Sequence, residues 1–523
     1  MQVSTELAPI DMLESDGLPM NNGCFMTLGQ RLRAIAHAEP DREAIADSSG
    51  CVLTYGQVLE RAEQLVHWLT TERAAERNIG VYLPSSTVAA LANYAITLAG
   101  KVAVNLNFTV GEQHCRAAVE VCGLQTIFTS RAFLAKLGIE PMAEMVFVED
   151  LRTEGNGATS VPHSGPDSTA CILFSSGTTG VPKGIQLTHW NILANAAGLA
   201  ARLPPSASDC LLGVLPFFHS FGYTFALWFP VLYGIRAAFH GNPTDARTIG
   251  ELAEKYKTTY LLSTPTLCQQ YARKLPPHQF ASLKYVLVGA EKLRDSIARE
   301  FKDHFGIDLL AGYGCTELGP GVAINTPTES RPGSVGQPLD GIEIRIADPD
   351  TLEPLPTGQQ GMILVNGPSR MPGYYRAPEL TRQAIRDGFY VTGDLGYVDE
   401  DGFLYVTDRV SRFSKICGEM IPHLPIEEAI CELTQSFVVG VPDDLRGERL
   451  ILLYTNAEAT PSDIYRRLLQ SGLPPLWIPK RDDIHGVPAI PVLPSGKVDL
   501  RRSRELAESL TMRGEVSESS AAS

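Results

Sequence analysis

Short apolar runs that end in a glycine, a proline or another small residue recur along most of the chain. They include NIGVYLP, GKVAVNLN, TYLLSTP, LKYVLVGAEKL and IDLLAGYG, and helical patterns separate them. Strands that alternate with helices form a largely parallel sheet, and such sheets place their ligands at the carboxyl ends of the strands. The sequence therefore predicts an α/β fold whose binding residues follow these runs.

The pattern changes twice towards the C-terminus. From about residue 333 the runs IEIRIAD, GMILVNG and GFLYVTD alternate with turn residues, which favours an antiparallel β section. After Asp408, runs such as FVVGVPD and LILLYTN indicate a small α+β unit, and 523 residues are too many for one compact core. We therefore predict an N-terminal extension (1–27), a large domain of layered α/β subdomains with a β section (28–410), a small α+β domain (411–508) and a disordered Ser/Glu/Ala-rich tail (509–523).

The charge and the cysteines exclude several classes of partner and site. A net charge of −15 argues against nucleic acid or an anionic membrane as a bulk electrostatic partner. The ten cysteines are scattered without a Cys-x-x-Cys pair, so neither a zinc ribbon nor a disulfide framework is indicated. This usage fits a reducing compartment, and no secretory signal precedes Arg31, the first basic residue. We expect a cytoplasmic protein.

One segment, residues 211–235, is long enough to span a bilayer and contains no Asp, Glu, Lys or Arg. Pro216, Gly222 and Pro230 interrupt it, and the chain has no second span of this kind. The sequence therefore favours buried core or the wall of an apolar pocket, and predicts no transmembrane segment.

The first candidate binding element is the loop in ILFSSGTTGVPKG. Backbone N–H groups of a Gly-rich turn can hold an anion, and Ser and Thr hydroxyls add donors without bulk. The loop departs from the usual phosphate loop, because Pro182 stands where that loop has its second glycine. A flexible surface turn is the alternative. The candidate residues are Ser175, Ser176, Gly177, Thr178, Thr179, Gly180 and Lys183.

The second element is LLAGYGCTELGP, in which a strand pattern runs into a Gly-bracketed turn. An aromatic face can stack on a purine, a hydroxyl can reach a phosphate, and a carboxylate can hold Mg²⁺. A turn with a helix-capping Thr is the alternative. The candidates are Gly312, Tyr313, Gly314, Cys315, Thr316 and Glu317.

Two further elements each present one charged candidate. Asp394 lies on a tight turn after an apolar run in GFYVTGDLG, and such a carboxylate can bind both hydroxyls of a ribose. An ordinary Asp-containing turn is the alternative. Lys497 lies in the turn LPSGK near the C-terminus, where a solvated surface lysine is the alternative.

The stretches SSGTTGVPKG, YGCTEL, YVTGDLG, DRVSRFSKICGEMI and LPSGK occur in this order. Together they resemble the ordered motifs of the adenylate-forming, or AMP-binding, superfamily, which includes acyl-CoA synthetases, luciferases and the adenylation domains of peptide synthetases. The resemblance covers about residues 28–505. It implies ATP and Mg²⁺ as cofactors, and a small C-terminal domain that is mobile and rotates between two half-reactions.

The resemblance also implies how the candidates bind ATP. The loop from Ser175 to Gly180, with Lys183, would grip the β- and γ-phosphates. Thr316 would contact the α-phosphate, Glu317 would hold Mg²⁺, and Lys497 would bridge the α-phosphate and the substrate carboxylate.

The nucleoside would lie among the remaining candidates. Tyr313 would stack on adenine, with Gly289, Ala290 and Glu291 of VLVGAEKL lining the other side. Asp394 and Arg409 would bind the ribose.

The resemblance also implies that two residues of the C-terminal unit act in the thioester-forming step. Ser411 aligns with the hinge position of the family, which is usually Asp or Lys, so a switch that relies on a charge there is in doubt. Lys415 would act in the second conformation, with an exposed loop cation as the alternative. RFSKICGEM and the late segment LWIPKRDDIHGVPAIPVLPSGKVDL are similar to the acyl–acyl carrier protein synthetases, close to the fatty acyl-CoA ligases. The thiol acceptor would be the phosphopantetheine of a carrier protein or CoA.

The segment LPFFHSFGYTFALWF indicates which class of carboxylic acid is the substrate. Peptide-synthetase domains anchor an amino group with an Asp after a Phe, and no acidic residue stands near this position. Because an unpaired buried ammonium is costly, a hydrophobic acid is expected instead of an amino acid. His219 resembles the gate residue of the family near the carboxylate, with a structural His as the alternative. The aromatic residues are apolar walls or simply core: Phe217, Phe218, Phe221, Phe225 and Trp228.

The sequence therefore predicts an AMP-forming ligase that converts a hydrophobic (fatty) acid and ATP to an acyl-adenylate and pyrophosphate, then forms a thioester on an acyl carrier protein. An acyl-CoA ligase is the alternative. A catalytically inactive nucleotide-binding or scaffold protein is the third hypothesis. Such a protein would be expected to have lost Lys497, Glu317 or Asp394, and all three are present.

Overall fold

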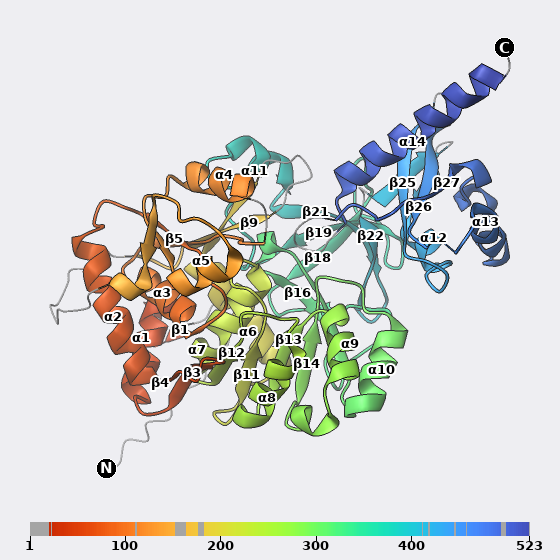
Figure 1. Cartoon of the computed structure of the whole chain (residues 1–523). Coiled ribbons are helices and arrows are strands. Elements are labelled where there is room, and N and C mark those ends of the chain that lie inside the picture. Colours follow the sequence, from red (N-terminus) through yellow and green to blue (C-terminus); the bar gives the residue numbers. More distant parts are fainter. Residues whose placement is uncertain are drawn as a thin grey trace.

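The computed structural model describes residues 20–21, 24–109, 112–151, 164–175, 182–409, 412–416, 419–443, 446–456, 458–492 and 498–521. Figure 1 shows a large part, coloured from red to teal, and a smaller blue C-terminal part at one end of the molecule. The large part contains three main sheets, and a short hairpin of β1 (Met20–Asn21) and β2 (Cys24–Phe25) precedes them. This arrangement confirms the predicted α/β fold with a smaller C-terminal unit.

The first sheet has six strands in the order β10-β9-β6-β5-β7-β8 and is parallel except for the β9–β10 pair. Its strands are β5 (Asn78–Val81), β6 (Val102–Asn105), β7 (Ile127–Thr129), β8 (Met145–Phe147), β9 (Thr169–Ser175) and β10 (Lys183–Thr188). The helices within this stretch are α3 (Thr87–Leu98), α4 (Glu112–Cys122) and α5 (Arg131–Leu137). The β9–β10 pair brings together the two ends of the glycine-rich loop.

The second sheet has nine strands in the order β17-β16-β15-β14-β13-β11-β12-β3-β4. They are β3 (Glu43–Asp47), β4 (Val52–Thr54), β11 (Cys210–Gly213), β12 (Arg236–Phe239), β13 (Tyr260–Ser263), β14 (Tyr285–Val288), β15 (Leu309–Gly314), β16 (Gly321–Ile324) and β17 (Gln337–Pro338). The six strands from β15 to β3 are parallel, so the carboxyl ends of β13, β14 and β15 meet at one edge.

The helices of this half are α1 (Leu28–Ala38), α2 (Tyr55–Thr71), α6 (His189–Arg202), α7 (Phe229–Tyr233), α8 (Ala246–Tyr256), α9 (Pro265–Lys274) and α10 (Asp295–Phe305). Several begin with a reciprocal cap. Thr27 caps α1 with Gln30, Thr54 caps α2 with Gln57, and each pair satisfies backbone donors that the first helical turn leaves free.

The third sheet is antiparallel, as the turn-rich pattern from about residue 333 predicts, and the C-terminal sheet is also mainly antiparallel. The third comprises β18 (Glu343–Ala347), β19 (Gly361–Asn366), β20 (Ile385–Arg386), β21 (Phe389–Val398) and β22 (Leu404–Arg409), with helix α11 (Pro378–Ala384). The C-terminal unit comprises β23 (Phe413–Ile416), β24 (Glu419–Pro422), β25 (Ser436–Asp443), β26 (Gly447–Tyr454) and β27 (Ile484–Gly486), with α12 (Leu424–Glu428), α13 (Pro461–Gln470) and α14 (Leu500–Ala521).

Helix α14 covers most of the tail that its composition predicted to be disordered. Arg501–Glu505 and Arg504–Glu508 are ion pairs one helical turn apart, a spacing that supports an exposed helix.

Two polar contacts join the C-terminal unit to the large part. The ammonium of Lys292, just after β14, lies 2.7 Å from the carboxylate of Glu428 in α12. The backbone N–H of Leu424 donates to Oδ2 of Asp408 at 3.1 Å. Both contacts lie beside the strand that carries Arg409.

The uncharged segment 211–235 is core. It forms β11, the π-helix η2 (Phe221–Trp228) and α7, and the ring of Trp228 packs edge-on against Tyr94 of α3 at 5.1 Å between centroids. Helix α3 buries every residue except Val88, as expected of a helix enclosed on all sides. No helix within the described residues is both long enough and apolar enough for a bilayer crossing.

Candidate active site

The centre of the candidate site is the carboxylate of Asp394, which is 3% exposed. Asp394 in β21 and Arg409 in β22 are cross-strand partners, and Arg409 Nε donates to Oδ1 at 2.8 Å. From the neighbouring sheet, the hydroxyl of Tyr313 at the end of β15 donates to Oδ2 at 2.5 Å. The structure therefore brings together three residues that lie far apart in the sequence.

Tyr313 acts in this contact as a donor. Burial, together with the nearby Asp394 carboxylate, raises the pKa of Tyr313 well above its usual range. The phenol therefore keeps its proton at any working pH. Arg409, in contrast, leaves much of its side chain exposed, with a fractional exposure of 63%.

The turn η4 (Thr316–Leu318) follows β15 directly. Glu317 is 8% exposed, and Oε1 of its carboxylate accepts a hydrogen bond of 3.0 Å from the hydroxyl of Tyr374. The hydroxyl of Ser220 donates to Oγ1 of Thr316 at 3.1 Å, and Oγ1 of Thr224 donates to the carbonyl of Gly319 at 2.7 Å. Segment 220–228 therefore holds this turn from one side.

Glycines allow other groups to approach the backbone closely beside this turn. A Cβ on Gly314 would lie 2.2 Å from the carbonyl oxygen of Pro320, so no larger residue fits there. A Cβ on Gly289 would lie 3.5 Å both from the carbonyl oxygen of Gly312 and from the ring edge of Phe221. Gly289, Gly312 and Phe221 therefore border one narrow region at the carboxyl ends of β14 and β15.

The neighbours of these glycines have separate contacts. Ala290 has a φ of +66°, a left-handed conformation, and the carboxylate of Glu291 accepts from the hydroxyl of Thr266 in α9 at 2.6 Å. The backbone N–H of Cys315 donates to the carbonyl of Pro320 at 3.0 Å, and burial raises the pKa of the Cys315 thiol well above its usual range. Cys315 is therefore a neutral thiol.

The remaining candidates lie around this centre or outside the described residues. Lys183 begins β10, with its ammonium 5.6 Å from the centre of the Tyr374 ring. His219 is exposed, with its ring centroid 4.6 Å from that of Phe218. Ser176, Gly177, Thr178, Thr179, Gly180, Ser411 and Lys497 lie outside the described residues, as do the side chains of Ser175 and Lys415, whose backbones belong to β9 and β23.

The aromatic residues of segment 217–228 divide into two groups. Phe217, Phe225 and Trp228 are buried in the main core, and Phe218 packs edge-on against Phe108 at 4.9 Å. Phe221 alone of the five is half-buried and borders Gly289. The alternative that these aromatic residues are core therefore holds for the four buried ones, Phe217, Phe218, Phe225 and Trp228.

Two functional candidates, Tyr374 and Ser220, have no signal in the sequence. Each acts through a contact with the Thr316–Glu317 turn, which lies 57 residues before Tyr374 and 96 residues after Ser220. No short motif joins either residue to its partner. Only the contacts in the structure identify them.

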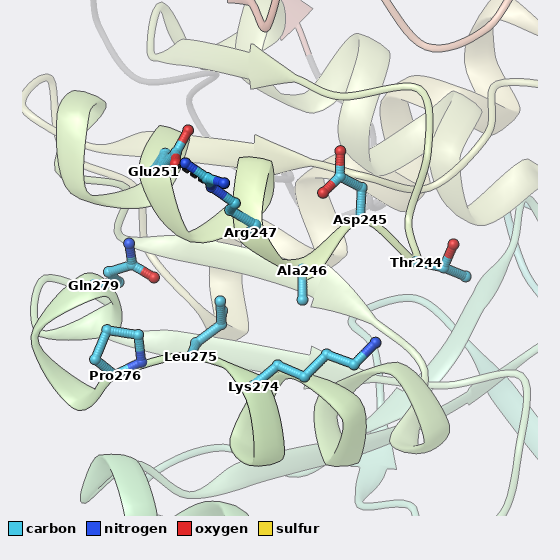
Figure 2. Close-up of a pocket in the computed structure, with 9 residues that line it drawn as sticks. All are labelled: Thr244, Asp245, Ala246, Arg247, Glu251, Lys274, Leu275, Pro276 and Gln279. Carbon is cyan, nitrogen blue, oxygen red and sulfur yellow. Dashed lines mark hydrogen bonds and ion pairs between the residues drawn. The ribbon is translucent and has the colours of Figure 1, made fainter.

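A separate surface cavity of about 460 Å³ lies between α8 and α9. Figure 2 shows its charged side chains, with Arg247 and Glu251 paired on α8 and Lys274 on the facing helix. None of the candidate nucleotide-binding residues lines this cavity, so it is distinct from the site around Asp394.

The donor set suits a magnesium–nucleotide complex. Within the part of the chain that the structure describes, no three His, Cys, Asp or Glu side chains gather as a metal cage. Mg²⁺ usually keeps several waters and is held by one or two carboxylates together with substrate phosphates. A single buried carboxylate at Glu317, beside the hydroxyl of Thr316, fits that mode of binding.

Comparisons with known proteins show what the whole chain is similar to. A family model described as AMP-binding enzyme matches residues 32–375. The long-chain-fatty-acid–CoA ligase of Bacillus subtilis (strain 168) is 27% identical, over 93% of this chain and 95% of that protein. The 4-coumarate–CoA ligase 1 of Narcissus pseudonarcissus is also 27% identical, over 93% of each chain. The solved structure of ATP-bound MatB from Rhodopseudomonas palustris superposes with a TM-score of 0.81 at 26% identity, over 92% of this chain and 99% of that one.

Proposed function

Because this chain belongs to the AMP-binding enzyme family, we propose that it is an AMP-forming ligase that activates a hydrophobic carboxylic acid and joins it to a thiol. In the first step a carboxylate oxygen attacks the α-phosphorus of ATP, and pyrophosphate leaves. In the second step a thiolate attacks the acyl carbon, and AMP leaves. The observation that carries this proposal is the meeting of Asp394, Arg409 and Tyr313 beside the Thr316–Glu317 turn.

Asp394 is suited to binding the ribose. A carboxylate offers about four lone-pair sites, and Arg409 and Tyr313 each occupy one of them. Two sites are left to accept from the two hydroxyls of a ribose. The exposed guanidinium of Arg409 would hold the nucleotide from the solvent side. Tyr313, with Gly289, Ala290 and Glu291 opposite, would border the adenine.

Thr316 and Glu317 would act on the phosphates. Because Ser220 donates to Oγ1 of Thr316, the proton of the Thr316 hydroxyl is free to point towards the α-phosphate. Glu317 would hold Mg²⁺, which, when bound, offsets the negative charge of the phosphates. Lys183 and the loop from Ser175 to Gly180 would hold the outer phosphates, and Lys497 would neutralise the approaching carboxylate.

The acid would lie against Phe221 and Gly289, with His219 near its carboxylate. An apolar ring beside a glycine offers no partner for a charged group, which favours a hydrophobic acid. The relatives named for long-chain fatty acids and for 4-coumarate accept hydrophobic acids of very different shape. The chain length or ring of the acid would therefore depend on the residues that border Gly289.

Phe221→Ala tests this placement. The smaller side chain is expected to favour bulkier acids, changing the ratio of kcat/KM between a bulky and a small acid by about tenfold or more. The measurement is kcat/KM over a panel of acids at saturating ATP. Phe221→Leu should give an intermediate ratio, and an unaltered ranking of acids would place the substrate elsewhere.

CoA is the better supported thiol acceptor. The relatives from Bacillus subtilis and Narcissus pseudonarcissus are both named as CoA ligases, and this chain matches them over nearly their full lengths. A carrier-protein phosphopantetheine is the second candidate, favoured by the RFSKICGEM stretch that contains Lys415. In both cases residues 28–410 would bind ATP and the acid. Residues 411–508 would turn about Ser411 before the thiol attacks.

Intact-mass spectrometry distinguishes the two acceptors. The protein is incubated with ATP, Mg²⁺ and a panel of free acids, with CoA and a phosphopantetheinylated carrier protein in the same tube. Acyl-CoA with an unmodified carrier is the expected result. An acyl mass on the carrier would overturn the CoA assignment, and the spectrum would identify the preferred acid in either case.

A further inference from the structure

The segment from Met371 to Tyr375 connects two elements of the candidate site. The backbone N–H of Tyr375 donates to the carbonyl of Gly184 in β10 at 2.7 Å, and Gln186 donates to Gly373 at 3.3 Å. At its other end, the N–H of Met371 donates to the carbonyl of Glu317 at 2.8 Å. The segment is therefore bonded both to the strand that leaves the glycine-rich loop and to the turn that carries Glu317.

The side chain of Tyr374 contacts the same two elements of the site as the backbone of its segment. Its hydroxyl donates to Oε1 of Glu317 at 3.0 Å, and its ring lies 5.6 Å from the ammonium of Lys183. A cation within about 6 Å of an aromatic ring is attracted to its face. One residue, 7% exposed, thus contacts both the carboxylate proposed for Mg²⁺ and the lysine proposed for the outer phosphates.

The hydroxyl of Tyr374 has a clear role towards Glu317. A buried carboxylate oxygen without a hydrogen-bond donor carries a desolvation penalty, which turning the side chain or taking up a proton relieves. The Tyr374 hydroxyl removes that penalty and holds the carboxylate in one orientation.

We infer that Tyr374 is a positioning residue that couples the phosphate-binding strand to the metal carboxylate. Its hydroxyl orients Glu317 for Mg²⁺, and its ring orients Lys183, so that both charges reach the same triphosphate together. This inference rests on the proposed function, because it takes Glu317 and Lys183 as ligands of magnesium–ATP. It adds a residue from a third segment, between β19 and β21, to that site.

The test is Mn²⁺ binding in the presence of ATP and without any acid, followed by electron paramagnetic resonance. Tyr374→Phe keeps the ring beside Lys183 and removes only the hydroxyl, so the dissociation constant of Mn²⁺ is expected to rise about tenfold. Tyr375→Phe is the matched control, because the hydroxyl of Tyr375 accepts from Asn78 at 3.0 Å and, among the residues that the structure describes, has no hydrogen bond to a candidate site residue. Its Mn²⁺ affinity should equal that of the wild type.

A double-mutant cycle separates positioning from a general structural role. If Tyr374 acts through Glu317, Tyr374→Phe should cause no further loss of Mn²⁺ affinity in a Glu317→Gln background. An equal loss in both backgrounds, or wild-type affinity for Tyr374→Phe alone, would overturn the inference. Because no acid is present, a failure to find any acid substrate would affect the proposed function and leave this result standing.

Discussion

Lys497→Ala is expected to slow acyl-adenylate formation by about 10²–10³ or more. The attack of a carboxylate on a polyphosphate brings two anions together, so a positioned cation between them stabilises the transition state more than the separate substrates. Exchange of labelled pyrophosphate into ATP, measured with the preferred acid, reports this step alone. An unaltered exchange rate would show that Lys497 does not take part in acyl-adenylate formation.

Two controls test whether the loss of pyrophosphate exchange is specific to the first step and to Lys497. Thioester formation from synthetic acyl-adenylate should proceed at the wild-type rate, because Lys497 is assigned only to the first step. Lys480→Ala removes an exposed lysine from the same C-terminal unit, and pyrophosphate exchange should be unaffected. A loss in both variants would indicate damage to the unit as a whole.

Asp394→Asn is expected to weaken ATP binding by about 1.5–3 kcal/mol, roughly 10- to 150-fold. The amide keeps the shape of the side chain but not its charge, and its NH₂ group cannot accept from the guanidinium of Arg409 or the hydroxyl of Tyr313. Calorimetric titration of ATP with Mg²⁺ measures the effect. Wild-type affinity would show that this carboxylate does not bind the nucleotide.

The ribose itself supplies a sharper comparison. In the wild type, 2′-deoxy-ATP should bind more weakly than ATP, whereas Asp394→Asn should bind the two nucleotides almost equally. Asp401→Asn is the control, since this exposed carboxylate lies in the turn between β21 and β22 and pairs with Arg331 instead of Arg409. It should keep the wild-type preference for ATP.

The pattern of apolar runs was sufficient to predict the fold class. A parallel sheet buries both faces of its strands, so each continuous apolar run indicates a buried strand. The small residue that ends the run indicates where the strand reaches the edge of the sheet. Tyr313 lies at the end of β15, and Thr316 and Glu317 lie in the turn after it, so the same pattern also pointed to these three residues. The resemblance implied only that Asp394 and Arg409 both bind the ribose, and the structure adds that the two are cross-strand partners in direct contact.

The contacts made by long loops were beyond the sequence. Tyr374 and Ser220 reach the Thr316–Glu317 turn from segments that neither motif spacing nor periodicity connects to it. The burial of the aromatic residues in the π-helix η2 was likewise not predictable from the sequence. Its widened turn changes which side chains share a face, so composition alone does not separate buried Trp228 from half-buried Phe221.

The antiparallel pairing of β21 and β22 fixes the length of the turn that joins them. Val398 and Leu404 are the last partners before that turn, and Asp394 faces Arg409 further along the same ladder. Because side chains alternate between the two faces of a strand, inserting or deleting one residue in the turn and slipping the register would direct Arg409 away from Asp394. Libraries that vary the identity of residues 399–403 at constant length should therefore retain ATP binding, whereas single-residue insertions there should abolish it.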